Sequence, residues 1–419
     1  MNPSNSAETE ISSPTSAYHA TMLEETNAVF CSEWNQQKST PIKRSLSGMD
    51  TKVFKEARDG NIDALREHND HLHQKLTPTK NTVLHVYIAC VGSAKLTKSE
   101  EELLKSAEIV REMLQMSQWL LLQPNESGDT ALHLAARHGC ADIVGVLIQA
   151  AKDWHGDLEE GISSKESCYR FLIRRPNEEK NTALHEAVRF NHLDVVKILT
   201  REDPDFRYSA NDAGETPLYI AAERGYYDLV SEILHTCTNS SYQGPVGLTA
   251  LHAAAIYNDE QITRRLLETE RTLAIASDDR GLTPLHMAAY MGRVSIVKQI
   301  LECDNSTAYI VNNYKMTPVH YAAIAGHVDV LVELIFYCPD SFELVDHEGR
   351  NALHFAIIND KHGVEEFVRK DPWLSSVLLN GKDSVGNTPL HYIVTSQKYP
   401  GLKFIHDSRV DKMAFNKKK

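Results

Sequence analysis

The segment Thr283-Pro284-Leu285-His286 is one of nine copies of a short pattern that decides the fold of this 419-residue chain. Each copy begins with Thr, or once with Asn351, and ends with His, or once with Tyr219. Successive copies start 48, 52, 34, 33, 34, 34, 34 and 37 residues apart. Self-similarity at a fixed period is typical of repeat architectures, so one structural unit is predicted to recur along the chain. The signature residues are Thr82, His85, Thr130, His133, Thr182, His185, Thr216, Thr249, His252, Thr283, His286, Thr317, His320, His354, Thr388 and His391.

The pattern has the chemistry of a helix start. Thr is a good N-cap because its hydroxyl accepts from an amide of the first turn, and Pro is favoured directly after it. His three residues later can reach back to the cap, as in a capping box. Nine residues after the Thr stand types that tolerate a left-handed backbone, which predicts the end of each first helix. These residues are Gly139, Asn191, Gly225, Asn258, Gly292, Gly326 and Asp360.

A second segment with helical apolar periodicity follows each first helix, for example at residues 328–335, and predicts an outer helix. A turn is predicted before the signature, and in five of the nine copies Asn or Asp stands five residues upstream and Gly two upstream, as at Asp278 and Gly281. The period near 33 and the signature resemble the ankyrin repeat, a β-turn followed by two antiparallel helices. We therefore expect an all-α ankyrin-repeat solenoid of about ten repeats.

Departures from the period divide the chain. Residues 1–48 are rich in Ser and Thr and are expected to form a disordered tail, followed by an N-terminal capping repeat at 49–78. The array itself is expected at 79–387, with insertions near 92–106 and 151–175. The first insertion is predicted to lengthen the connection before an outer helix at 107–116, and residues 153–167 of the second are predicted to form an exposed loop. Residues 388–419 are expected to hold a last, incompletely capped repeat that frays after about residue 395, and a basic tail.

Composition limits the class of partner and the compartment. With 44 Lys plus Arg against 57 Asp plus Glu, the chain carries a net charge of −13, which disfavours nucleic acid. Seven cysteines without a Cys-x-x-Cys pair indicate thiols in a reducing compartment. The sequence as printed has no signal peptide and no run of about 20 apolar residues, so we expect a cytoplasmic chain that does not itself insert into a membrane.

The sequence offers no candidate catalytic, cofactor-binding or metal-binding residues. Eight of the 20 histidines stand in the signature column, one per repeat, and helix layers about 8–10 Å apart keep them from converging on one ion. His185-Glu186-Ala187-Val188-Arg189 lacks the second His of a zincin motif, and no phosphate loop or nucleophile elbow occurs. We therefore expect no enzyme, no cofactor and no small-molecule substrate.

A solenoid without an active site works by offering a long concave surface to a partner. The two positions before the end of each first helix change along the array from mostly charged to mostly apolar, and the mostly charged pairs are Arg137 and His138, Arg189 and Phe190, and Glu223 and Arg224. Exposed side chains of these apolar types would make a protein-binding patch, because they are good hot spots. The alternative is that some of them lie beneath neighbouring turns as ordinary core. The candidate residues are Ile256, Tyr257, Tyr290, Met291, Ile324 and Ile358.

Three segments resemble plant ankyrin-transmembrane proteins of the accelerated-cell-death and salt-tolerance type, at residues 76–85, 120–133 and 177–189. The last reads Asn177-Glu178-Glu179-Lys180-Asn181-Thr182-Ala183-Leu184-His185 and includes a linker that the generic repeat does not fix. The resemblance implies a non-enzymatic regulator of plant defence, salicylic-acid signalling, cell death or stress response. It also implies relatives anchored in the plasma membrane with their repeats on the cytoplasmic side.

The resemblance leaves two functional interpretations. Such proteins continue into a hydrophobic domain with a Pro-Gly-Gly signature, whereas the printed sequence stops at Lys419. We expect an interaction scaffold whose partners are other proteins, with full-length membrane-anchored relatives among the candidates. The alternative is the cytoplasmic regulatory part of a membrane protein whose activity lies in transmembrane segments outside this sequence.

Overall fold

The structure is a computed structural model that describes residues 48–67, 69–95, 99–154, 165–395 and 402–417. All of these residues belong to one unit, Ser47–Lys419, which is described here by itself. The predicted N-terminal tail lies outside the described residues apart from Gly48, and so does the part of the second insertion at 155–164. The described residues form α-helices, short 3-10 turns and one isolated β-bridge between Gln243 and Thr249, which confirms the all-α class.

The helices form pairs, in which the first member is called the inner helix and the second the outer helix. The inner helices are α2 Thr51–Asp59, α4 Val83–Ala94, α6 Ala131–Arg137, α9 Ala183–Arg189, α11 Pro217–Glu223, α13 Ala250–Tyr257, α15 Pro284–Tyr290, α17 Pro318–Ala325, α19 Ala352–Ile358 and α22 Pro389–Thr395. The outer helices are α3 Ile62–Arg66, α5 Glu100–Met116, α7 Ala141–Lys152, α10 Leu193–Glu202, α12 Tyr227–Thr236, α14 Glu260–Thr269, α16 Val294–Cys303, α18 Val328–Tyr337, α20 His362–Lys370 and α23 Leu402–Ile405.

Additional helical segments follow some of the outer helices. Helix α8, Lys165–Arg174, precedes the inner helix α9, and α21, Pro372–Leu378, follows α20. The 3-10 turns are η1 Asn69–Gln74, η3 Gln118–Leu121, η4 Pro245–Gly247, η5 Arg271–Ile275, η6 Asn305–Tyr309 and η7 Pro339–Glu343.

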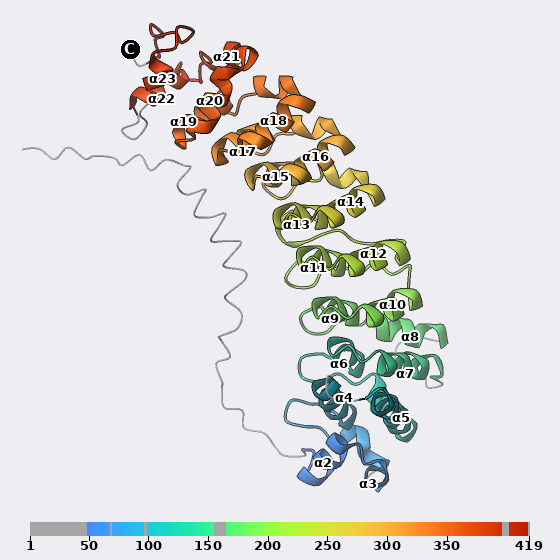
Figure 1. Ribbon diagram of the computed structural model, residues 1–419. Helices are drawn as coiled ribbons and strands as arrows, with labels where there is room; N and C mark the ends of the chain where they lie inside the picture. The colour runs from blue at the N-terminus through green and yellow to red at the C-terminus, as the bar shows by residue number, and fades with distance from the viewer. Residues whose placement is uncertain (1–47, 68, 96–98, 155–164, 396–401, 418–419) are drawn as a thin grey trace, which may run out of the picture. The chain divides into compact units, whose positions relative to one another are not determined.

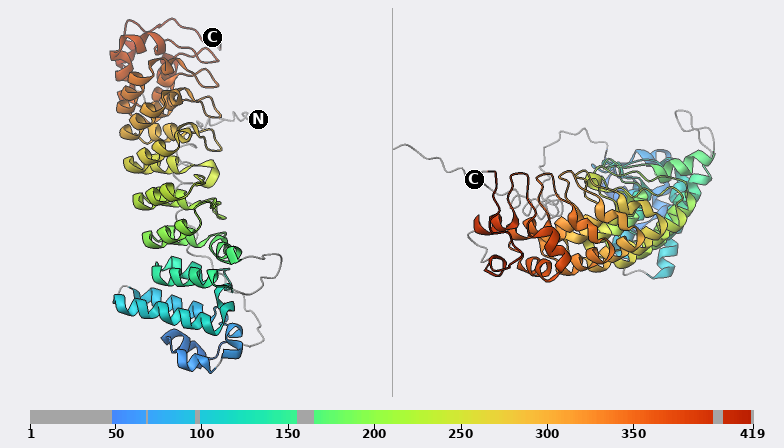
Figure 2. Two further views of the ribbon diagram at one scale, coloured as in Figure 1. Left: turned by 90° about the vertical axis from the view of Figure 1, so that its right-hand side faces the viewer. Right: turned by 90° about the horizontal axis from the view of Figure 1, so that it is seen from above.

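The pairs stack into two rows. Each inner helix from α2 to α19 contacts the next inner helix along the chain, and each outer helix from α3 to α18 contacts the next outer helix (Figure 1). Figure 2 shows the turns that precede the inner helices side by side along one edge of the stack. Each repeat therefore contacts its sequence neighbours, which is the arrangement that the regular period predicts.

The signature residues begin the inner helices through reciprocal hydrogen bonds. At α15, the Thr283 amide donates to Nδ1 of His286 over 3.1 Å, and the Thr283 hydroxyl lies 2.8 Å from the same nitrogen. The capping box is also present at Thr82, Thr130, Thr182, Thr249, Thr317 and Asn351. The predicted helix ends are confirmed, because all seven Gly, Asn and Asp residues have φ between 55° and 88°.

The same histidines connect one repeat to the next. Because Nδ1 of His286 accepts from an amide, its Nε2 carries the proton and donates to the carbonyl of Met316 over 3.0 Å. Burial lowers the pKa of His286 to about 4, so the ring is neutral at pH 7. The other histidines of this ladder bond in the same way to carbonyls of the following repeat: His85, His133, His185, His252, His320 and His354.

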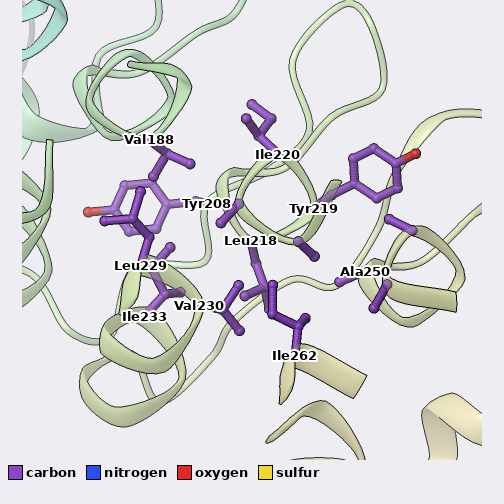
Figure 3. Close-up of a cluster of buried hydrophobic side chains, with 14 of the residues drawn as sticks. Val188, Tyr208, Leu218, Tyr219, Ile220, Leu229, Val230, Ile233, Ala250 and Ile262 are labelled. Atoms are coloured by element: carbon purple, nitrogen blue, oxygen red, sulfur yellow. The ribbon is translucent and has the colours of Figure 1, made fainter. Parts of the chain in front are cut away.

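Apolar side chains of the inner and outer helices fill the space between the two rows of helices. Figure 3 shows Leu218 of α11 beside Val230 of α12 and Ile262 of α14, and each of these side chains is at most 1% exposed. Burying one such side chain contributes about 1.5–3 kcal/mol. The core is therefore shared between adjacent repeats, because a single helix pair has too little apolar partner surface of its own.

The turns before the inner helices are joined by backbone hydrogen bonds. The Ser384 amide donates to the carbonyl of Glu348 over 2.7 Å, and the Lys417 amide donates to that of Val385 over 2.8 Å. Lys417 therefore corresponds to Ser384, and Asn416 takes the position in its turn that Asp383 takes in the turn one repeat earlier. Phe404 of α23 is 0% exposed, so residues 402–417 pack against the preceding repeat. The prediction of fraying after about residue 395 is wrong for residues 402–417, which extend the stack, whereas residues 396–401 and 418–419 lie outside the described residues. The division into domains stays a prediction.

The two insertions differ from the prediction. The charged stretch before residue 107 was predicted to be a connection, but α5 already begins at Glu100. The reason is local, since Ser99 and Glu102 form a capping box that starts the helix about two turns earlier. Of the loop predicted at 153–167, residues 155–164 lie outside the described residues, and residues 165–167 are helical rather than a loop because α8 begins at Lys165. Helix α8 packs against α7 and buries Leu172 and Ile173.

Candidate interaction surface

The candidate binding residues lie where inner helices end, at the fourth and fifth positions after the signature His. The structure places all six on the inner-helix row but exposes them unequally. Tyr257 has half of its surface exposed, at 50%, whereas the other five are partly buried. Tyr290 shows why exposure differs, because its ring lies edge-on to that of Tyr321 in the next inner helix, with 6.0 Å between ring centroids. An apolar residue type at these positions therefore does not by itself indicate an exposed side chain.

The exposed part of this surface lies in three consecutive repeats. Phe190, Arg224 and Tyr257 occupy the same register after α9, after α11 and at the end of α13, and all three are exposed. Phe190 is 49% exposed and stacks on His192, with 6.5 Å between ring centroids. We call these three residues the inner-face triad. Aromatic and arginine side chains with this exposure are the types that dominate protein interfaces.

Carboxylates lie beside the triad. Glu223 precedes Arg224 at the end of α11, and its pKa is raised by burial and by the nearby carboxylate of Glu215. The pKa of the Tyr257 phenol is raised by burial and by Glu223. The triad therefore combines two aromatic rings and a guanidinium with a partly buried acidic group, which suits contacts with both apolar and cationic groups of a partner.

The arginines in earlier repeats are already paired. The guanidinium of Arg137 bonds Glu186 over 2.8 Å and Asp129 over 3.0 Å, and that of Arg189 bonds Glu215 over 2.9 Å. These arginines were interpreted from the sequence as a charged half of the binding face. In the structure they join neighbouring repeats, because Glu186 lies on α9 and Glu215 lies just before α11, each in the repeat that follows the arginine. Asp129 lies just before α6, in the repeat of Arg137 itself.

No cluster of three or more His, Cys, Asp or Glu side chains suited to a metal ion occurs within the described ranges. The histidine ladder uses both ring nitrogens of His286 for hydrogen bonds to protein groups. Across the same part of the chain, no helix combines the length and apolar character that crossing a membrane requires.

The chain matches a family model described as ankyrin repeats (3 copies) at residues 161–243, 236–310, 276–338 and 319–416. A model of the single ankyrin repeat also matches residues 127–155. These matches agree with the period, the capped turns and the paired helices.

Three curated proteins illustrate the similarity of this chain to known sequences. Neurogenic locus notch homolog protein 1 of Xenopus tropicalis is 29% identical over 182 residues, which are 43% of this chain and 6% of that protein. Ankyrin repeat-containing protein ITN1 of Arabidopsis thaliana is 35% identical over 129 residues, 29% of this chain and 21% of ITN1. Protein ACCELERATED CELL DEATH 6 of the same plant is 29% identical over 131 residues, 31% of this chain and 19% of that protein. This chain thus matches about a fifth or less of each relative's length.

Proposed function

Because this chain belongs to the ankyrin-repeat family, we propose that it is a non-enzymatic scaffold that binds other proteins through the inner-face triad. The observation that carries this proposal is the exposure of Phe190, Arg224 and Tyr257 at one register of three successive repeats. A row of side chains at repeat spacing can contact an extended or helical segment of a partner, and each repeat adds one contact.

The biological setting of the proposal comes from the plant relatives. The name of one of them refers to accelerated cell death, and the linker segments at 76–85, 120–133 and 177–189 resemble that plant group. We therefore place the scaffold in plant defence, salicylic-acid signalling, cell death or stress response, on the cytoplasmic side. Its partners would include the membrane-anchored relatives.

Affinity capture from plant tissue tests the triad. We expect the double substitution Phe190→Ala with Tyr257→Ala to reduce capture of the specifically bound proteins at least tenfold, as loss of two interface hot spots does. Phe54→Ala is the matched control, because this ring is 40% exposed on α2 at the other end of the described repeats. An unchanged set and amount of captured proteins would refute the role of the triad. A double variant that melts well below the wild type would show that the rings stabilise the fold instead.

A second interpretation is that these repeats regulate a membrane protein whose activity lies outside this sequence. It is favoured by the alignments, which cover about a fifth of the plant relatives. Reading the transcript beyond the codon for Lys419 tests it. An open frame with several apolar stretches of about 20 residues supports this interpretation, and a stop codon at that point contradicts it.

A further inference from the structure

The outer face of α18 differs from that of every other outer helix in the regular part of the array. The fifth and ninth residues of the outer helices that follow α6, α9, α11, α13, α15, α17 and α19 can be compared in register. The ninth residue is Gln149, Arg201, His235, Glu268, Glu302, Phe336 and Lys370 in order. The fifth is Gly145, Lys197, Ser231, Arg264, Lys298, Val332 and Glu366. Only α18 has a large apolar side chain at both positions.

These side chains are exposed and lie close together. Phe336 is 76% exposed and Val332 is 45% exposed, and they stand one turn apart on α18. The ring of Tyr337 lies edge-on to that of Phe336, with 5.0 Å between centroids. Trp373, 36% exposed, belongs to α21, which packs against η7 just after α18. We call Val332, Phe336 and Tyr337 the α18 patch. Single exposed apolar residues are ordinary, but two exposed side chains beside a partly buried tyrosine ring indicate a contact surface.

Carboxylates stand on α18 itself and on η7, which follows it. Residues 316–349, a full repeat, contain six Asp and Glu and no Lys or Arg. Asp346 and Glu348 pair with Arg350, whereas Asp329, Glu333 and Glu343 have no cationic side chain within 4.0 Å in the described part of the chain. The Tyr337 hydroxyl donates to Glu302 over 3.0 Å, and the Tyr309 hydroxyl donates to Asp340. On the flanks, Lys298 is exposed and Lys370 is paired with Glu366 over 2.9 Å.

We call Asp329, Glu333, Asp340 and Glu343 the rim of the α18 patch. The negative charge of the rim favours some binding partners over others. A second copy of the chain would bring the same carboxylates against the patch, and each copy carries −13. An anionic membrane surface is repelled by the same carboxylates. A segment with apolar side chains on one face and Lys or Arg at its edges satisfies both the patch and the rim.

We infer that the α18 patch is a docking site for a basic amphipathic helix of a partner protein. Val332 and Phe336 are spaced i and i+4 on α18, which is the spacing of apolar side chains on one face of a facing helix. The cationic residues of that helix would lie over Asp329, Glu333, Asp340 and Glu343. This site lies on the outer row and does not depend on the inner-face triad.

Fluorescence anisotropy with the full chain tests the inference. The probe is a labelled synthetic helix of about 18 residues with leucines on one face and lysines on the other, and its counterpart carries glutamate in place of lysine. We expect the lysine peptide to bind and the glutamate peptide not to bind. Equal binding of both peptides, or binding of phosphatidylserine vesicles in place of the lysine peptide, would overturn the inference.

Substitutions taken from neighbouring repeats locate the site. The double variant Val332→Lys with Phe336→Glu gives α18 the residues that α16 has at Lys298 and Glu302, so it is expected to fold. We expect it to weaken binding of the lysine peptide at least tenfold. The matched control, Ser231→Lys with His235→Glu, places the same residues at the same register of α12 and is expected to keep wild-type affinity. Equal affinity in both double variants would contradict the site.

A charge variant gives a second readout that does not change the apolar side chains. Asp329→Asn with Glu333→Gln removes two carboxylates of the rim, so we expect weaker binding and a smaller loss of affinity as salt is raised. Unchanged affinity and an unchanged salt dependence in this variant would show that the rim does not select the partner. Melting curves of all variants distinguish lost binding from lost folding.

Discussion

Acidification is expected to destabilise the repeats through the buried histidine ladder. Burial lowers the pKa of His252, His286 and His320 to about 4 in the folded chain, whereas an exposed histidine has a pKa of 6.5. The unfolded chain therefore binds more protons between these two values. Stability contributed by each neutral ring is complete above pH 6.5 and is lost as the pH falls toward 4.

The size of the effect follows from the two pKa values. Between pH 7 and pH 5, each ring with this shift should lose about 2 kcal/mol of stability. Geometry supports the direction, because a proton on Nδ1 of His286 would face the Thr283 amide that now donates to it over 3.1 Å. Several rungs act together, so a stack that unfolds cooperatively should lose several times this amount.

Urea unfolding of the wild type and of His286→Gln at both pH values isolates one rung. The variant loses hydrogen bonds to Thr283 and Met316 and should be less stable at pH 7 by about 1–3 kcal/mol. Its further loss on going to pH 5 should be smaller than that of the wild type by about 2 kcal/mol. Carboxylate titration is common to both proteins and cancels in this difference. Equal losses in both proteins would refute a neutral buried ring at this position.

Three further substitutions test the repeat frame by thermal or urea unfolding. Lys315 has φ of 59° at the turn position where six of the nine copies have Gly, so Lys315→Gly should stabilise the chain by about 0.5–1 kcal/mol, and a loss would show that its side chain matters more than its backbone. Leu285 is 0% exposed, so Leu285→Ala should cost about 2–5 kcal/mol, and a cost below 1 would contradict its burial. A Cβ at Gly244 would lie 2.2 Å from the ring of Tyr219, so Gly244→Asn should cost about 1–3 kcal/mol of stability. Adding Tyr219→His to this variant should recover most of the lost stability, and equal stabilities of the single and double variants would refute this coupling.

The frame of the fold could be predicted because its causes are local. A Thr cap with His three residues later fixes a helix start, and a Gly or Asn nine residues later fixes the end, without reference to distant residues. The start of α5 could have been found by the same rule, since Ser99 and Glu102 form a capping box. The charged stretch around it lacks apolar periodicity, so periodicity alone places the start of this helix near residue 107.

Exposure on the inner face could not be predicted in the same way. Whether Tyr290 is exposed depends on Tyr321 in the next repeat, and the Thr-to-His spacing does not set how closely two rings approach. In the sequence, Phe190 stands in the mostly charged part of the inner face, in a pair with Arg189. In the structure Arg189 is occupied by Glu215, and Phe190 is left exposed. The partners of each side chain, rather than its type, decide which residues a binding protein can reach.

In a repeat protein, each position can be compared with the same position in the other repeats, and this comparison shows which residue types are unusual. Positions in the same register of successive outer helices have the same backbone environment, so a difference in residue type there is not required by the fold. Phe336 stands where α16 has Glu302 and α20 has Lys370, and each of those charged residues is compatible with the stack. A side chain that is 76% exposed adds little to the core, so packing does not explain why this one register holds an aromatic ring. The buried rings of the inner row differ from Phe336, because their contacts with neighbouring residues explain why those positions hold aromatic side chains.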